Sequence, residues 1–124
     1  MSLSSSGLEP AFLDIQLALD QIGDTQAMHG MLAMLEESLA RDIPGIARLL
    51  EEGDLIAANR VLHSIKGFIP IFCVDALCKH VASVELLSKG GDWAEITKAY
   101  AGLRPDLLLL QAEVASYLND QGAS

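Results

Sequence analysis

The sequence predicts one all-α domain, an up-down antiparallel four-helix bundle with a short additional N-terminal helix. Apolar residues recur at steps of three and four through most of its 124 residues, which is the period of amphipathic helices. No segment shows the period-two alternation of a half-buried strand. Aromatic residues make up 5% of a composition dominated by Leu, Ala, Ile and Glu, and this favours helix over sheet. Short connections between long amphipathic helices favour antiparallel neighbours, and therefore a bundle.

Three Gly-Asp dipeptides, at 23–24, 53–54 and 91–92, mark boundaries between the expected helices. Glycine suits the left-handed residue that closes a helix, and aspartate is a strong cap for the start of the next one. Between these marks the apolar residues keep the helical spacing. The dipeptides therefore predict where the second, third and last helices begin.

Five helices are expected in order. The first is short, and its apolar residues are Leu8, Phe12, Ile15, Leu19 and Ile22. The second spans about 25–51, and its stripe continues past Pro44, so we expect one kinked helix rather than two. The third covers about 54–72, the fourth about 74–88 and the last about 92–119. The stripe of the last helix consists of Trp93, Ile96, Tyr100, Leu103, Leu107, Leu110, Val114 and Tyr117. The Met, Trp and Tyr residues of all these stripes are expected in the core.

The length suits one domain, which we expect to cover residues 8–119. Residues 1–7 have the composition of a linker or a cloning remnant, and residues 120–124 are expected to form a C-terminal tail. The sequence leaves open whether the domain stands alone or belongs to a longer protein.

Charge and cysteine content limit the function classes. Eight basic residues against 17 acidic ones give a net charge of −9, which argues against nucleic acid or an anionic membrane as the main partner. No apolar run approaches the roughly 18 residues of a membrane span, and no leader resembles a secretion signal. Cys73 and Cys78 lie five residues apart and point in different directions, so we expect free thiols in a reducing cytoplasm.

The third helix is expected to carry the chemistry, on the face that holds His63. At 100° per residue, an apolar arc falls opposite this histidine, made of Ala58, Val61, Leu62, Ile65, Phe68, Ile69 and Phe72. The residues on its own side are Ile56, Asn59, Arg60, Lys66, Gly67 and Pro70. His63 therefore lies in the middle of the face that is turned away from the core.

The neighbours of His63 favour a role in handling an anion. A glycine inside a helix costs about 1 kcal/mol relative to alanine, so Gly67 makes sense if a partner must approach beside the imidazole. Lys66 can swing its ammonium group toward an anion held on His63. Arg60 and Lys66 are the only charged residues from Ile56 to Val74, which makes this face locally basic on an acidic chain.

Imidazole itself is a suitable nucleophile. With an ordinary pKa of roughly 6.5 it is largely neutral at cytoplasmic pH. Its attack on an acyl phosphate gives a phosphoramidate that is labile enough to be passed on. The sequence has no obvious phosphate loop, nucleotide fingerprint or metal-binding carboxylate cluster. No cofactor is therefore expected in this domain, and Mg²⁺ and a phospho-aspartate would come from the partner.

The segment Leu62-His63-Ser64-Ile65-Lys66-Gly67 resembles the His-x-x-Lys-Gly motif of histidine-containing phosphotransfer (HPt) domains in bacterial two-component phosphorelays. The resemblance extends from about Leu13 to Leu118. It includes the turn at 22–24, the proline midway along the second helix, the turn at 52–54 and the Gly91-Asp92-Trp93 helix start.

The resemblance implies that His63 is the phosphorylated histidine. It also implies that Lys66 supports the phosphoryl group and that Gly67 leaves room for the incoming receiver domain. Such domains usually have no kinase activity of their own and shuttle phosphoryl groups between receiver domains, often at the C-terminus of a hybrid sensor histidine kinase. We expect a cytoplasmic monomer that docks response-regulator receivers through Ile56, Asn59, Arg60 and Pro70.

One departure from the family pattern follows the motif. Pro70 cannot donate a backbone hydrogen bond, so the third helix is expected to kink or to stop early there. Two other functions stay open on the residues alone. The first is a degenerate HPt-like module that binds a receiver or a kinase without being phosphorylated. The second is a metal-binding bundle that uses His29, His63 and His80, although no ligand-like spacing relates these three histidines.

Overall fold

The computed structural model describes residues 10–123, and their side chains as far as Asp120. The expected linker at 1–7 lies outside the described residues. The helices are α1 (Ile15–Ile22), α2 (Thr25–Glu51), α3 (Leu55–Phe68), the 3₁₀ helix η2 (Ile69–Ile71), α4 (Asp75–Gly90) and α5 (Trp93–Ala123). Within residues 10–123 there is no strand, and the single β-type contact is an isolated bridge between Leu13 and Cys73.

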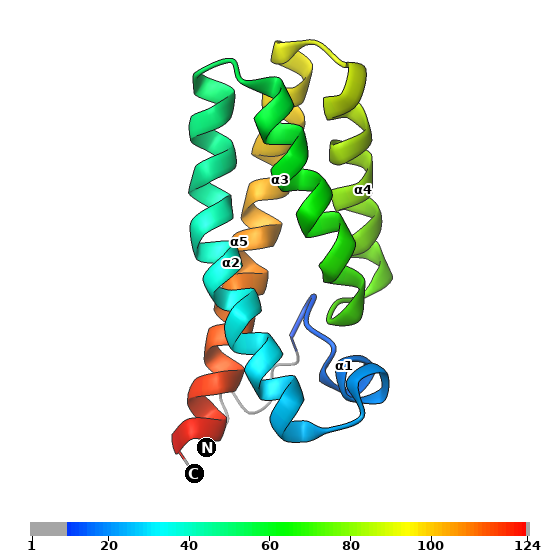
Figure 1. Ribbon diagram of the computed structural model, residues 1–124, viewed down its shortest axis with the longest axis vertical. Helices are drawn as coiled ribbons and strands as arrows, with labels where there is room; N and C mark the ends of the chain where they lie inside the picture. The colour runs from blue at the N-terminus through cyan, green and yellow to red at the C-terminus, as the bar shows by residue number, and fades with distance from the viewer. Residues whose placement is uncertain (1–9, 124) are drawn as a thin grey trace.

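Helices α2 to α5 run up and down beside one another, and α1 lies at one end of them (Figure 1). Each of the pairs α2–α3, α3–α4, α4–α5 and α2–α5 is in contact, so the four helices close a bundle. Helix α1 packs against α2 and η2. The predicted fold class, a four-helix bundle with an additional N-terminal helix, is confirmed. None of the described helices is both long enough and apolar enough to cross a membrane.

Aspartates cap the helices at the positions that the sequence predicts. Asp24 accepts a hydrogen bond from the Ala27 backbone N–H, and Asp54 accepts one from that of Ala57. The glycine before each of these caps has a positive φ, 86° at Gly23 and 75° at Gly53. These two Gly-Asp turns therefore work as expected, because glycine alone adopts that backbone conformation without strain.

The third Gly-Asp turn is built differently. Gly91 has a φ of −79°, and a Cβ there would lie 2.8 Å from the Leu87 carbonyl oxygen. Glycine is needed at this position because the backbone passes close to the end of α4, not because of a left-handed turn. Asp92 still accepts a hydrogen bond from the backbone N–H of Glu95, at 2.8 Å, and so caps α5.

The core forms from the predicted apolar stripes. On α3 the buried residues include Ala58, Leu62 and Ile65, and Ile69 and Phe72 follow them into the interior. One expectation is wrong: Trp93 is 48% exposed. It is the first residue of α5, at the end of the bundle, and its indole N–H donates to the carbonyl oxygen of Leu50. Tryptophan suits such a partly exposed position, because its rings cover apolar surface while its indole N–H donates a hydrogen bond.

The α-helical part of the histidine helix ends four residues before the expected position 72, at Phe68. Pro70 lies in η2 and cannot donate to the carbonyl four residues back, which explains the early end. The chain continues as a tight turn in which the backbone N–H of Phe72 donates to the Ile69 carbonyl at 3.0 Å. In contrast, α5 continues past its expected end at 119 and runs to Ala123.

The segment before α1 is not helical, so Phe12 does not belong to the first helix as expected. The Val74 N–H donates to the Phe12 carbonyl at 2.9 Å, and the Asp14 N–H donates to the Phe72 carbonyl at 2.8 Å. The Glu113 carboxylate of α5 accepts from the backbone N–H groups of residues 11 to 13. These bonds tie the N-terminal segment both to the loop that follows the histidine helix and to α5.

Candidate functional site

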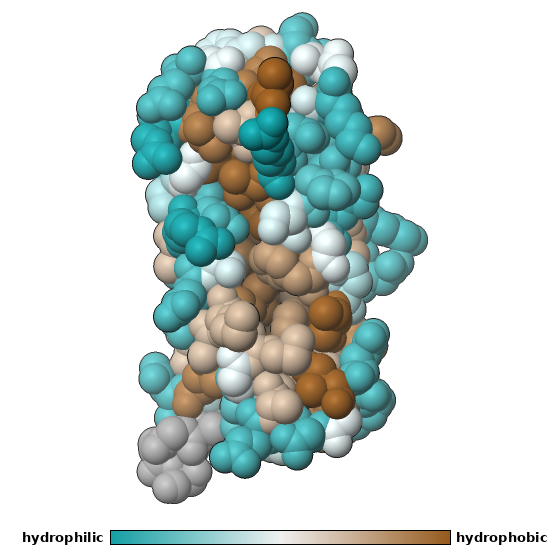
Figure 2. Space-filling model, in the orientation of Figure 1, coloured by the Kyte–Doolittle hydropathy of each residue, from teal (hydrophilic) through white to brown (hydrophobic). Residues whose placement is uncertain are grey.

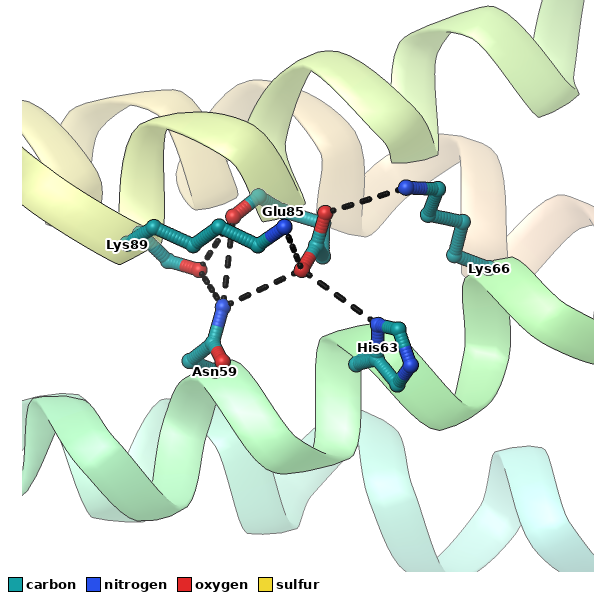
Figure 3. A network of polar contacts seen from close by, with 6 residues as sticks. Asn59, His63, Lys66, Glu85 and Lys89 are labelled. Atoms are coloured by element: carbon teal, nitrogen blue, oxygen red, sulfur yellow. Dashed lines mark hydrogen bonds and ion pairs between the residues drawn. The ribbon is translucent and has the colours of Figure 1, made fainter.

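His63 lies midway along α3 with 68% of its side chain exposed, on the face that the helical spacing predicts. Its Nδ1 atom is 3.5 Å from Oε2 of Glu85, a residue of α4. In Figure 3 the other ring nitrogen, Nε2, points away from this carboxylate. One nitrogen of the imidazole therefore faces a carboxylate, and the other is left free for a partner.

Glu85 is the centre of the polar network in Figure 3 and is fully buried, with 0% of its side chain exposed. A buried carboxylate is costly unless charges and hydrogen bonds compensate it. Lys66 Nζ lies 3.4 Å from Oε1, and Lys89 Nζ lies 3.6 Å from Oε2. Asn59 Nδ2 donates to Oε2 at 3.3 Å. Glu85 therefore has three partners besides His63.

The net effect of these contacts is to lower the pKa of Glu85. Burial by itself raises the pKa of this carboxyl group. Hydrogen bonds from Lys66 and Asn59, together with the charges of Lys66 and Lys89, outweigh burial. Glu85 is therefore an ionised carboxylate at neutral pH, and it presents a fixed negative charge to Nδ1 of His63.

Helix periodicity explains why these side chains meet. Asn59, His63 and Lys66 recur at steps of four and three along one face of α3. On the facing side of α4, Ser88 and Lys89 lie three and four residues after Glu85. Asn59 Nδ2 donates to Ser88 Oγ at 2.7 Å, and Ser88 Oγ donates to the Glu85 carbonyl oxygen at 2.6 Å. The first bond joins the two helices and helps to fix the register between them, and the second holds Ser88 within α4.

The structure brings part of the predicted site together. His63, Lys66 and Asn59 share one network, but the Asn59 amide is bound to α4 and is not a free donor for a partner. Gly67 is exposed, and nothing lies within 4 Å of the place where its Cβ would be. The surface one turn beyond His63 is therefore open, as the prediction of access for a partner requires.

Two grooves border α3 and the turn that follows it, and His63 lines neither of them. The α3–α4 groove has a volume of about 290 Å³ and is lined by Leu55, Ile56, Asn59, Ser88, Lys89, Gly90 and Gly91. Ile56 is 71% exposed there. The α2–η2 groove has a volume of about 160 Å³ and is lined by Met31, Met34, Leu35, Ser38, Phe68, Ile71 and Phe72. Figure 2 shows apolar side chains gathered over the lower half of this face of the molecule. Arg60 and Pro70 are exposed.

Sequence reasoning missed Glu85 and Lys89. A signal was present, because Glu85 follows Leu77 and Val81 at steps of four, which places a carboxylate in the apolar stripe of α4. For His29 and His80, a solvated or capping role is the default expectation. His29 Nε2 instead lies 3.1 Å from the Tyr117 hydroxyl, and His80 Nδ1 lies 2.9 Å from Asp106 Oδ2.

The residues that the structure describes contain no group of three or more His, Cys, Asp or Glu side chains that could hold a metal ion. Nor do His29, His63 and His80 converge, because each has a different partner. The two cysteines are free thiols. Burial raises the pKa of the Cys73 thiol, so it stays protonated and unreactive at neutral pH.

Comparison with known proteins supplies the family. The family model described as "Hpt domain" matches residues 30–119, a stretch that contains the whole of α3 and α4 and most of α2 and α5. The comparisons with curated proteins and with solved structures gave no match. Membership of this family implies histidine phosphotransfer in phosphorelays and interaction with response-regulator receiver domains. Because the match covers well over half of its length, the chain belongs to the Hpt domain family.

Proposed function

We propose that this domain is a phosphorelay intermediate in which His63 accepts a phosphoryl group from the aspartate of one receiver domain and passes it to another. One observation carries the proposal. His63 is exposed at the centre of its face, while its Nδ1 atom lies against a buried, ionised carboxylate. The histidines at 29 and 80 lack this arrangement, because each is held by a partly buried partner on α5.

Glu85 selects the nucleophilic nitrogen. A carboxylate beside Nδ1 favours the tautomer that carries the proton on Nδ1, which leaves the lone pair on Nε2. Nε2 then attacks the phosphorus of the acyl phosphate. The new P–N bond forms as the P–O bond to the receiver's aspartate breaks, and the aspartate leaves as a carboxylate. The phosphorylated ring keeps its Nδ1 proton and becomes cationic, and Glu85 balances that charge.

The onward step reverses these bond changes. The carboxylate of a second receiver attacks phosphorus, and Nε2 leaves as a neutral imidazole with its proton still on Nδ1. Lys66, whose Nζ is bound to Glu85 at 3.4 Å, neutralises charge on the phosphoryl oxygens during both steps. The receiver supplies the Mg²⁺, and this domain contributes no kinase activity of its own.

The receiver docks over the His63 face and covers parts of both grooves. Ile56 in the α3–α4 groove offers an exposed apolar contact. Met34, 66% exposed, offers another beside the apolar α2–η2 groove. Arg60 and Pro70 complete the contact surface. Asn59 acts indirectly, because its hydrogen bond to Ser88 holds α3 against α4. We place this relay in the cytoplasm, with the domain as a monomer, either free or within a hybrid sensor kinase.

The direct test is transfer from a phosphorylated receiver with Mg²⁺ to the wild type and to His63→Gln, with His29→Gln and His80→Gln as matched controls. We expect label that is labile to acid and stable to base on the wild type and both controls, and none on His63→Gln. Receiver binding without label on any of the four proteins would instead support a docking module that is not phosphorylated.

A further inference from the structure

Glu85 is shared by two lysines from different helices. Lys66 of α3 approaches Oε1 at 3.4 Å, and Lys89 of α4 approaches Oε2 at 3.6 Å. Oε2 is also the oxygen that faces Nδ1 of His63, at 3.5 Å. Lys89 and the imidazole therefore meet at the same carboxylate oxygen (Figure 3).

This two-to-one arrangement differs from the other lysine and arginine ion pairs of the described residues. Arg41 pairs with Asp42, Arg48 with Glu52 and Lys79 with Asp75, each with a single acid. The cluster at Glu85 instead holds one ammonium group more than the carboxylate needs for neutrality. In a chain whose net charge is −9, a local excess of positive charge beside an exposed histidine suits a dianionic group.

Lys89 is the more exposed of the two lysines, at 52% of its side chain against 42% for Lys66. Glu85, in contrast, is fully buried and held by Asn59 and Ser88 through side-chain and backbone atoms. An ion pair to a half-exposed ammonium group contributes little, so moving Lys89 away from Glu85 costs little. A phosphoryl group offers this lysine three acceptor oxygens and stronger charge-assisted hydrogen bonds.

We propose that Lys89 is a second phosphoryl-binding cation, which Glu85 holds in the unphosphorylated domain and which moves to the phosphoryl group once His63 carries it. This inference rests on the proposed function and adds a residue to it. The positive charge that Lys89 takes away from Oε2 of Glu85 is replaced. As Lys89 leaves that oxygen, the newly cationic imidazole, with its proton on Nδ1, takes its place as the counter-ion. Glu85 thus keeps a positive partner throughout, and no proton has to move.

The test uses the full chain, with phosphoramidate as a phosphoryl donor that needs no receiver. In this reaction the P–N bond to ammonia breaks, ammonia leaves, and the bond to Nε2 forms. The variants are Lys89→Ala and Lys89→Arg. Lys79→Ala is the matched control, because Lys79 forms the corresponding i,i+4 pair with Asp75 on the same helix. Circular dichroism confirms that each variant is folded, and ³¹P NMR follows the titration of the phosphoryl group.

A nearby cation favours the dianionic form of the phosphoryl group, so removing it raises the titration midpoint. We expect Lys89→Ala to raise the midpoint by about half a pH unit, while Lys89→Arg and Lys79→Ala match the wild type. The other charged residues near His63, namely Arg60, Lys66 and Glu85, are the same in every variant. With a phosphorylated receiver, Lys89→Ala should also shift the transfer equilibrium toward the receiver by about threefold to tenfold.

The outcomes separate the two proposals. A wild type that is phosphorylated on His63, with Lys89→Ala at the same midpoint and the same equilibrium, overturns the role of Lys89 and leaves the proposed function standing. A wild type that takes no phosphoryl group from phosphoramidate or from a receiver overturns both. A raised midpoint in Lys89→Ala that Lys89→Arg restores supports the inference, because a purely structural role for Lys89 does not change the ionisation of the phosphoryl group.

Discussion

Two histidine–carboxylate pairs of this bundle make an instructive comparison. His63 and Glu85 join α3 to α4, and His80 and Asp106 join α4 to α5. The second pair is the tighter one, at 2.9 Å against 3.5 Å. It divides its burial evenly, with 36% of His80 and 34% of Asp106 exposed. In the first pair the histidine is open to solvent and the acid is fully buried.

The neighbours differ more than the pairs themselves. Three and four residues after His63 come Lys66 and Gly67, a cation and an open surface. Three and four residues after His80 come Ser83, whose hydroxyl donates to the His80 carbonyl, and Val84, which is buried. If His63 is the transfer site, as we propose, a carboxylate beside an imidazole is not enough to make one. Solvent access to the ring and a nearby cation distinguish His63 from His80.

The largest effect on phosphotransfer is expected from blocking the access of a receiver to His63. Gly67→Leu places a side chain on the open surface one turn from His63 and should reduce transfer from a phosphorylated receiver by more than about a hundredfold. Since nothing lies within 4 Å of the new Cβ, the free energy of unfolding should stay the same or rise by up to about 1 kcal/mol. Gly102→Leu, on exposed α5 surface that is also empty within 4 Å, is the control. Normal transfer by a folded Gly67→Leu protein would contradict the role of this glycine.

The next largest effect on transfer is expected from removing one of the two carboxylates, Glu85, and not the other. Glu85→Ala removes the group that orients the imidazole and should slow transfer by about tenfold to a hundredfold, by analogy with the loss of the partner that orients a metal-binding histidine. Asp106→Ala removes the shorter contact and should leave the transfer rate within about twofold of wild type. Rapid-quench kinetics measure both rates. Equal losses in the two variants would mean that the difference in burial has no functional meaning.

A smaller effect on the transfer rate is expected from removing the ammonium group of Lys66. Lys66→Ala should slow transfer by about tenfold, because it removes one charge-assisted contact to the phosphoryl oxygens while Lys89 remains. Lys98→Ala, which changes an exposed lysine of α5, is the control. Circular dichroism should show the same helicity in all three proteins. A large loss of helicity in Lys66→Ala would mean that this lysine holds the bundle together instead of serving the transfer.

In the His63–Glu85 pair, the sequence predicts the position of the histidine better than that of its carboxylate partner. The exposed position of His63 follows from the helical period, and the caps at Asp24 and Asp54 follow from local chemistry. Glu85 lies 22 residues beyond His63, and its meeting with the imidazole depends on the register between α3 and α4. That register is set by contacts such as Asn59 to Ser88, which no local pattern encodes.

The same reason explains the other differences between expectation and structure. Glu113 binds the backbone of residues 11–13 across about a hundred positions of sequence, and this contact holds Phe12 in a non-helical segment outside α1. Trp93 has helical spacing typical of a core residue, yet the end of the bundle leaves it half exposed. Pro70 is the counter-example, since its missing N–H is a local property and correctly predicts an early end for the histidine helix.

The smallest effect is on stability, and it is a dependence on pH that comes from Glu85. The pKa of Glu85 lies below its ordinary value of 4.5, so the unfolded chain binds a proton more readily than the folded one at this group. Its ionised form therefore stabilises the fold above pH 4.5, and this contribution is lost as the pH falls through the lower, folded-state pKa. The Glu85→Gln variant has no ionisable group at this position. Urea unfolding between pH 3 and pH 7 should give a wild type that loses stability relative to Glu85→Gln on acidification. A stability gap between wild type and Glu85→Gln that stays constant across this range would mean that the lysines do not hold Glu85 in its ionised form, and the proposed counter-ion for the phosphorylated ring would be lost with it.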